Sequence, residues 1–295
     1  MPNNLIIDEP ALHRHRSRAL AMAQSGVSTR ADFLMHQAAD DLSLRLSTIT
    51  REFKIAVDLN SVGVAVSDAM RLSGKCGQII QSRVAAFKDK QTSIVHGDDM
   101  LPIANDSVDL IASTLALQFA NDLPGILVQI RRALKPDGLF MGAVLGGGTL
   151  HELRESFLQA ESEIKGSAHA RVLPFMDVRA AGGLLQRAGF ALPVADIDTL
   201  TVRYDTALEL MHDLRAMGST NCLFDRDKKF LSRAVLARMI EVYAQNFSDP
   251  DGRIRATFEI ISLSGWTPHE SQQKPLKPGS AQMKLSEVLG DKYKR

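Results

Sequence analysis

Between residues 53 and 145, short apolar runs of strand type alternate with segments long enough to form helices. The runs read KIAVDL, GQII, TSIVHG, SVDLIAST and LFMGAVL. Strands that alternate with helix-length segments are typical of βαβ units, in which a crossover helix returns the chain so that successive strands pair in parallel. This alternation predicts an α/β fold with a doubly wound, mostly parallel sheet.

Further strand and helix patterns lie on both sides of these runs. Residues 10–51 repeat apolar residues at a spacing of three to four, which predicts two helices before the first strand. Strand patterns at 193–204 and 253–266 bring the expected sheet to seven strands. Helices are expected at 150–164, 177–190, 207–217 and 233–247, so a helical insertion precedes the last strand.

The clearest single helix is predicted for the segment NDLPGILVQIRRALKPDG. Asn121 or Asp122 can cap its first turn, where Pro124 is also well tolerated. Pro136 and Gly138 are expected to end it, because neither residue continues a helix well.

Composition excludes several classes of function. The chain has 295 residues and a net charge of +1, so no electrostatic bias toward nucleic acid is expected. Cys76 and Cys222 are far apart and lack metal-ligand spacing, which argues against a disulfide framework or a structural zinc. The most apolar windows, such as LIASTLALQFA, fall short of the roughly 20 residues that cross a bilayer. We expect a cytoplasmic protein without a transmembrane segment.

The histidines do not indicate a metal or a catalytic residue. His151, His212 and His269 are interpreted as surface or packing residues, since none belongs to a pair with metal-ligand spacing. No metal site is expected, and no catalytic residue is assigned.

The residues that follow the strands are the candidates for ligand binding. In an open parallel sheet, ligands bind outside the carboxyl ends of the strands, where the strand order reverses. The first strand runs into the stretch DLNSVGV, in which Asp58 ends the strand and Gly63 is the one glycine. Taken alone, this stretch favours an ordinary strand-to-helix turn.

The segment that follows carries a family resemblance. The stretch GDDMLPIANDSVDLIASTLALQFANDLPGILVQIRRALKPDGLFMGAVLGGGTL resembles the second half of a class I S-adenosylmethionine-dependent methyltransferase core. Later segments, such as GGGTLHELRESFLQAESEI, LMHDLRAMGSTNC and GWTPHESQQ, are similar to the methyltransferase-like family that assists assembly of respiratory complex I. That family includes a mitochondrial arginine hydroxylase. The resemblance runs over residues 8–281, whereas a more distant one, to the malonyl-carrier-protein methyltransferase of biotin synthesis, is expected in the core only.

This resemblance implies a division of the chain and a set of partners. It implies a helical extension, an S-adenosylmethionine-binding core, a helical cover with the remaining strands, and a polar tail, at 1–52, 53–150, 151–270 and 271–295. It also implies a protein substrate, such as a subunit of respiratory complex I.

The resemblance implies cofactor contacts in the loop after the first strand, at Asp58, Asn60 and Gly63. Asn60 stands in place of a family glycine and tolerates the left-handed region, so it can preserve the turn. Val62 and Val64 stand in place of later glycines. Their β-branched side chains resist positive φ and fill space that a ligand would use. A weakened or lost cofactor loop is therefore expected.

The second implied contact also departs from the family pattern. Gln81 and Ser82 stand where an adenosine-binding sheet places an Asp or Glu that holds the ribose hydroxyls. The lost hydrogen bond, worth roughly 1.5–3 kcal/mol, is expected to weaken cofactor affinity about ten- to a hundred-fold.

The remaining implied contacts follow the third and fourth strands. Asp98 or Asp99 is expected to meet the adenine amino group, and the backbone N–H of Asp99 or Met100 a ring nitrogen. Leu115 is expected to line the mouth of the pocket together with Gln118.

Several alternatives remain open from the sequence. The chain is either an S-adenosylmethionine-dependent enzyme that methylates or hydroxylates a protein, or a catalytically inactive assembly chaperone with the same fold. The stretch GGGT, residues 146–149, is either a flexible exit from a strand or a substrate loop. Lys274, Lys277 and Lys284 form either a solvated tail or a contact to an acidic partner or a membrane surface.

Overall fold

The strands of the computed structural model form one seven-stranded sheet in the order β3-β2-β1-β4-β5-β7-β6. The structure describes residues 5–25, 32–84, 93–97 and 99–273. The strands are β1 Phe53–Leu59, β2 Cys76–Val84, β3 Ile94–His96, β4 Val108–Thr114, β5 Leu134–Leu145, β6 Ala191–Tyr204 and β7 Ile254–Trp266. Strands β1 to β5 pair in parallel, and β7 is antiparallel to both β5 and β6. The predicted doubly wound, mostly parallel sheet is confirmed.

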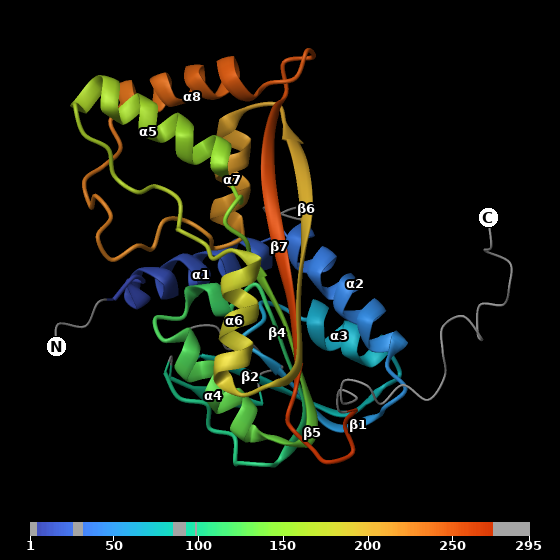
Figure 1. Cartoon of the computed structure of the whole chain (residues 1–295). Coiled ribbons are helices and arrows are strands. Elements are labelled where there is room, and N and C mark those ends of the chain that lie inside the picture. The colour runs from blue at the N-terminus through green and yellow to red at the C-terminus, as the bar shows by residue number, and fades with distance from the viewer. Residues whose placement is uncertain (1–4, 26–31, 85–92, 98, 274–295) are drawn as a thin grey trace, which may run out of the picture.

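The helices cover both faces and one end of this sheet (Figure 1). They are α1 Glu9–Gln24, α2 Phe33–Thr48, α3 Ala65–Leu72, α4 Leu123–Ala133, α5 His151–Lys165, α6 Val178–Ala188, α7 Ala207–Ala216 and α8 Arg233–Phe247, with a short 3-10 helix η2 Leu117–Phe119. Two helices precede the first strand, and α7 and α8 lie between β6 and β7, as the sequence predicts.

Helix α4 begins as predicted and ends earlier than predicted. The Asp122 carboxylate accepts a hydrogen bond from the Gly125 N–H at 2.9 Å and caps the helix. Asn121 instead binds the backbone of the N-terminal segment at Ile6 and Ile7. The prediction that Pro136 and Gly138 end the helix is wrong, because the helix ends at Ala133 and the backbone from Leu134 onward already pairs with β4 as part of β5.

Two apolar layers hold the sheet between its helices. On one face, α2 and α3 pack on β1 and β4 through residues such as Leu46, Phe53 and Met70. On the other face, α4 and α6 pack on the same strands and on β7 through residues such as Ile130 and Leu185. The central strands are therefore buried on both sides, which is the expected environment of a parallel sheet.

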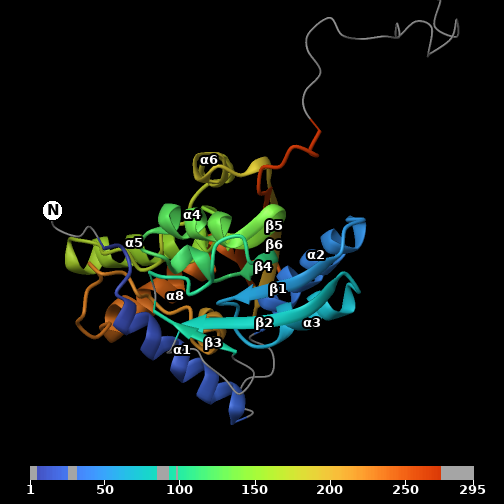
Figure 2. The same cartoon turned by 90° about the horizontal axis from the view of Figure 1, so that it is seen from below.

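The carboxyl end of the sheet has its own cover. Strands β6 and β7 are long and paired over their length, and they reach beyond the other strands toward α5, α7 and α8 (Figure 1). Apolar residues of these elements, including Phe157, Tyr243 and Phe258, form a third core. Helix α1 lies below this cover near β2 and β3, as the second view shows (Figure 2), and packs on Val84 through Leu12.

This arrangement positions one site. The strand order reverses between β1 and β4, and ligands of such sheets bind beyond the carboxyl ends of the strands at that point. In the described part of the chain, no helix has the length and apolar character needed to span a membrane.

Candidate functional site

The loop after β1 keeps a tight turn without the usual glycines. Asn60 adopts the left-handed conformation with φ 58°, and Gly63 does so with φ 74°. The Asn60 N–H donates to the Ser82 carbonyl at 2.8 Å, and its side-chain oxygen accepts from the Val84 N–H at 2.9 Å. The prediction that Asn60 preserves the turn is confirmed. The expected backbone conflict at Val62 and Val64 does not arise, because neither valine has a positive φ.

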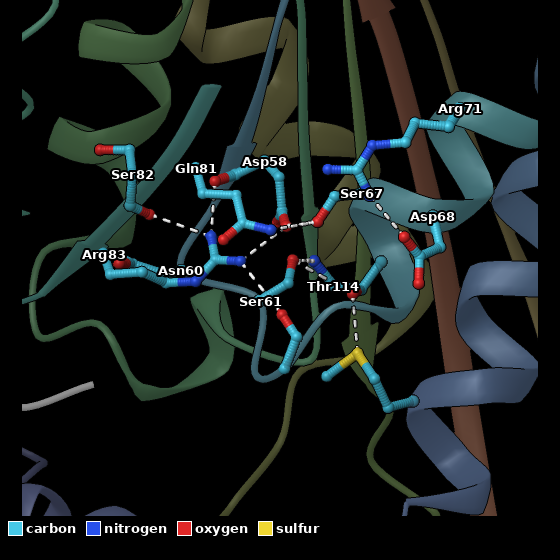
Figure 3. A network of polar contacts seen from close by, with 12 residues as sticks. Asp58, Asn60, Ser61, Ser67, Asp68, Arg71, Gln81, Ser82, Arg83 and Thr114 are labelled. Carbon is cyan, nitrogen blue, oxygen red and sulfur yellow. Dashed lines mark hydrogen bonds and ion pairs between the residues drawn. The ribbon is translucent and has the colours of Figure 1, made fainter. Parts of the chain in front are cut away.

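A buried ion pair lies directly beneath this loop (Figure 3). The Arg83 guanidinium donates to the Asp58 carboxylate at 2.7 Å, and the two side chains are 1% and 0% exposed. The same guanidinium donates to the backbone carbonyl of Asp58 at 2.6 Å and to that of Gly63 at 3.3 Å. Arg83 thus ties together the two ends of the loop that follows β1.

Polar side chains around the pair complete a network within the chain. The Ser67 hydroxyl of α3 donates to the Asp58 carboxylate at 3.1 Å, and the Gln81 amide donates to Ser67 at 2.5 Å. The Ser61 hydroxyl accepts from the Thr114 N–H of β4 at 3.1 Å. The network therefore joins β1, β2, α3 and β4 around the site (Figure 3).

The pKa of the Asp58 carboxyl is affected by its complete burial. Burial raises the pKa of the Asp58 carboxyl above its ordinary value, while the charge and hydrogen bonds of Arg83 and the hydroxyls of Ser61 and Ser67 oppose this shift. A carboxylate at this depth depends on its partner, because an ion taken out of water is costly unless it is paired and hydrogen-bonded.

The larger cavity of the site lies on the other side of Gly63. It has a volume of about 300 Å³ between α1, α2, the loop after β1 and the loop after β4. Leu115, with an unusual φ of 50°, and Gln118 are part of its wall, as are Val62 and Val64. The Gln118 side-chain oxygen is buried and has no hydrogen-bond partner among the described residues. The cavity wall is thus mostly apolar, with a few polar residues such as Gln118 and Asp32.

A smaller gap marks the side of the site toward β2 and β3. Its volume is about 40 Å³, and it is lined by Asn60, Val84 and Asp99 together with Leu12 of α1. Met100 lies outside this gap and is 74% exposed. Gln81 and Ser82 are buried in the network beneath the loop, and Asp98 lies outside the described residues.

The GGGT stretch is held by side chains of neighbouring elements. The Glu259 carboxylate of β7 accepts from the Gly148 N–H at 2.6 Å, and Arg154 of α5 donates to the Thr149 carbonyl at 2.9 Å. A Cβ at Gly148 would lie 2.3 Å from the Glu259 carboxylate. These glycines let the chain approach Glu259 closely.

A second cavity of about 210 Å³ lies deeper, beneath α5 and α7. It shares Leu34, Leu145, Met217 and Ser219 with the larger cavity, and most of its other lining residues are apolar. The two cavities are therefore neighbours that share part of their wall, one beside the loop after β1 and the other within the core of the cover.

One cluster of potential metal ligands lies in the described part of the chain, at Glu161, His169 and Asp227. The Glu161 carboxylate already accepts hydrogen bonds from Arg171, Lys165 and the His169 N–H. A cation there would compete with the positive charges of Arg171 and Lys165, so we assign no metal to it. His151 and His269 bind the Gly148 carbonyl and Ser271, respectively.

Sequence reasoning places Arg83 among the residues that follow the second strand but gives it no role. It placed the end of the second strand at residue 80, whereas β2 continues to Val84, so that Arg83 and not Gln81 or Ser82 reaches the carboxyl end. No acid occurs over residues 69–88, and the signal that could have identified Arg83 is a cation at the end of the strand in place of that acid.

The sheet order, the site at the reversal point and the loop after β1 define the fold of the class I S-adenosylmethionine-dependent methyltransferases. Residues 49–142 match a family described as a methyltransferase domain. The solved structure of YcgJ from Bacillus subtilis aligns with a TM-score of 0.52 at 14% identity, covering 79% of this chain and 99% of that one.

Sequence relatives narrow the class to one family. The mitochondrial arginine hydroxylase NDUFAF5 of Danio rerio is 35% identical over 271 residues, which cover 88% of this chain and 83% of the relative. This chain belongs to the NDUFAF5 family. The malonyl-[acyl-carrier protein] O-methyltransferase of Laribacter hongkongensis is 29% identical over 91% of this chain and 95% of its own length. The expectation that this second likeness is confined to the core is therefore wrong.

The residues of the site fit one half of S-adenosylmethionine. Its methionine end fits beside Gly63, where a Cβ would meet nothing within 4 Å and the larger cavity begins. Its adenosine end does not fit, because the gap of about 40 Å³ is far smaller than the roughly 300 Å³ or more of a usual ligand pocket. The Arg83 guanidinium is a donor only, so it cannot accept hydrogen bonds from ribose hydroxyls.

Proposed function

We propose that this chain acts on a protein substrate during assembly of respiratory complex I. The family likeness, which extends over 88% of the chain, is the observation that carries this proposal. The position of the larger cavity, at the reversal point of the sheet, supports it further.

An arginine-bearing segment is the substrate class that suits the cavity wall. The methylenes of an arginine can pack on Leu34, Leu115 and Leu145, and its guanidinium needs oxygen acceptors. Polar residues of the wall include Gln118, whose buried side-chain oxygen has no partner among the described residues, and Asp32 at the start of α2, whose carboxylate contacts His36 at 3.0 Å. The likeness to proteins named arginine hydroxylases agrees with this class of substrate.

The proposed function has a catalytic form and a non-catalytic form. In the catalytic form, the target arginine is methylated or hydroxylated, as the family membership suggests. In the non-catalytic form, the chain is an assembly chaperone that holds the segment without modifying it. The poor fit of adenosine, at the gap beside Val84 and Asp99, favours the chaperone over S-adenosylmethionine-dependent methyl transfer.

Mass spectrometry of complex I subunits from cells with and without this gene tests the proposal. A gain of one oxygen or one methylene on an arginine, dependent on the gene, supports the catalytic form. Reduced complex I assembly without any such mass change supports the chaperone. Normal assembly together with unchanged subunit masses would overturn the proposal.

Rescue with variants tests the cavity itself. We expect Gln118→Leu to lower rescue of assembly, because it removes the buried acceptor while keeping a similar volume. Gln159→Leu, on the exposed side of α5, is the matched control and should rescue fully. Equal rescue by both variants would place the substrate elsewhere.

A further inference from the structure

Arg83 lies where sheets of this fold usually carry a ligand-binding residue. It lies near the end of β2, next to the strand where the order of the sheet reverses. An adenosine-binding sheet carries an acid there, which accepts hydrogen bonds from the ribose hydroxyls. A guanidinium is a donor only, so it cannot take over that task.

The hydrogen-bond donors of Arg83 are directed into the chain. One terminal nitrogen donates to the carbonyls of Asp58 and Ser82, and the other donates to the Asp58 carboxylate and the Gly63 carbonyl. The side chain is 1% exposed. These contacts close the loop after β1 from beneath without a ligand (Figure 3).

The polar groups that flank Arg83 are engaged in the same way. The Asn60 side-chain oxygen accepts from the Val84 N–H, and the Gln81 amide reaches Asp58 through Ser67. Groups that could have met a ribose are therefore committed to neighbours in the chain. The small gap beside Val84 and Asp99 is what remains of the space.

We propose that the Asp58–Arg83 pair replaces the adenosine half of the cofactor as the group that closes the loop after β1, and that the chain therefore does not retain S-adenosylmethionine as its resident ligand. The loop then has a structural role, because residues 62–65 form part of the wall of the larger cavity. This inference rests on the proposed placement of the ligand site at the reversal point of the sheet, and it assigns Arg83 as the residue that decides ligand selectivity there.

Calorimetric titration of the full chain tests the inference with three probes: S-adenosylmethionine, S-adenosylhomocysteine and 5′-methylthioadenosine. We expect no saturable binding of any of them in the micromolar range. Micromolar binding of S-adenosylmethionine to the unaltered chain would overturn the inference.

A series of variants that restores the usual cofactor-site residues tests whether Arg83 is the reason that S-adenosylmethionine does not bind. Asn60→Gly with Val62→Gly restores the small residues of the loop and is expected to leave binding undetected. Adding Arg83→Asp to that pair supplies the missing acid and should tighten S-adenosylmethionine binding by about tenfold or more. A folded triple variant that binds no better than the double variant would contradict the role of Arg83.

Hydrogen exchange gives a second measurement that does not depend on the triple variant being folded. In the unaltered chain, we expect exchange of the backbone amides of residues 60–67 to be unchanged by millimolar S-adenosylmethionine, and the Asn60 amide, which donates to the Ser82 carbonyl, to be protected without ligand. Ligand-dependent protection of these amides would overturn the inference. Rescue of complex I assembly, measured on the same variants, reports on the proposed function separately, so either can fail alone.

Discussion

Two buried carboxylates in this protein are each held by an arginine, yet the two pairs differ in their surroundings. Asp58 and Arg83, beneath the loop after β1, are 0% and 1% exposed. Glu161 and Arg171, beneath the helical cover, are 0% and 13% exposed. The second pair has access to water through its arginine, and the first has almost none.

Their neighbours also differ. Glu161 is approached by Lys165 at 3.1 Å and by the His169 N–H at 2.8 Å, in addition to Arg171. Burial alone would raise the pKa of Glu161, but the hydrogen bonds from Arg171, His169 and Lys165 outweigh it and lower the pKa below its ordinary value. The pKa of Asp58 is raised.

The difference between the two pairs shows how residues of a ligand site can take on a structural role. Glu161 is kept ionised by three donors, Arg171, Lys165 and the His169 N–H, so losing one partner is tolerable. Asp58 is fully buried, and Arg83 is its one charged partner in the described network. The corner that would receive adenosine is thereby committed to Arg83, while the apolar space next to it stays available.

The largest expected effect is on the Asp58–Arg83 pair. Arg83→Met leaves Asp58 buried without a counter-charge, and we expect the free energy of unfolding to fall by about 3–5 kcal/mol in urea denaturation. Adding Asp58→Asn should recover most of the loss, because it removes the unpaired charge. Arg71→Met, whose pair with Asp68 is more than half exposed, is the control and should cost less than about 1 kcal/mol. If Arg83→Met also cost less than about 1 kcal/mol, the buried pair would contribute no more to stability than the exposed pair.

A smaller effect is expected at the cover. Glu161→Gln keeps the shape but removes the charge that Arg171 and Lys165 share, and we expect a loss of about 1–3 kcal/mol in the same measurement. Glu155→Gln, at an exposed position of the same helix, is the matched control and should change stability by less than about 0.5 kcal/mol. A loss at Glu161 that equals the loss at Arg83 would show that access to water does not separate the two pairs.

The pH dependence sharpens the same contrast. Because the pKa of Glu161 in the folded chain lies below its ordinary value of 4.5, its stabilising effect is complete above pH 4.5 and is lost as the pH falls through the folded-state pKa. The difference in stability between the unaltered chain and Glu161→Gln should therefore shrink on acidification below pH 4.5. A difference that grows in acid would contradict the lowered pKa.

The smallest expected effect tests whether the loop after β1 depends on local conformation as well as on Arg83. Gly63→Ala places a side chain at φ 74° in open space, so only the backbone is strained, and we expect a loss of about 1 kcal/mol. Gly183→Ala, in helix α6 and also without close neighbours, should instead stabilise by about 0.5–1 kcal/mol. Thermal unfolding measures the change in stability for both variants. If Gly63→Ala stabilised the protein as Gly183→Ala is expected to do, that would argue against backbone strain at residue 63.

Much of the fold could be predicted because it depends on local patterns. The strand patterns predict each strand of the sheet, and a cap of α4 at Asn121 or Asp122 follows from their position before Pro124, although only the structure decides for Asp122. Asn60 was expected to adopt a left-handed conformation because its side chain tolerates that region, and it does so. Strand and helix ends were less predictable, since β5 begins where pairing with β4 begins.

The sequence by itself determined the class of fold, the position of the site at the ends of β1 and β4, and the departure from the usual cofactor loop. Only the tertiary structure decided what replaced the missing acid. Asp58 and Arg83 are 25 residues apart, and their pairing depends on the parallel register of β1 with β2, which places Asp58 beside Gln81. No local pattern marks an arginine near a strand end as buried, because its burial depends on which distant carboxylate the folded sheet brings beside it.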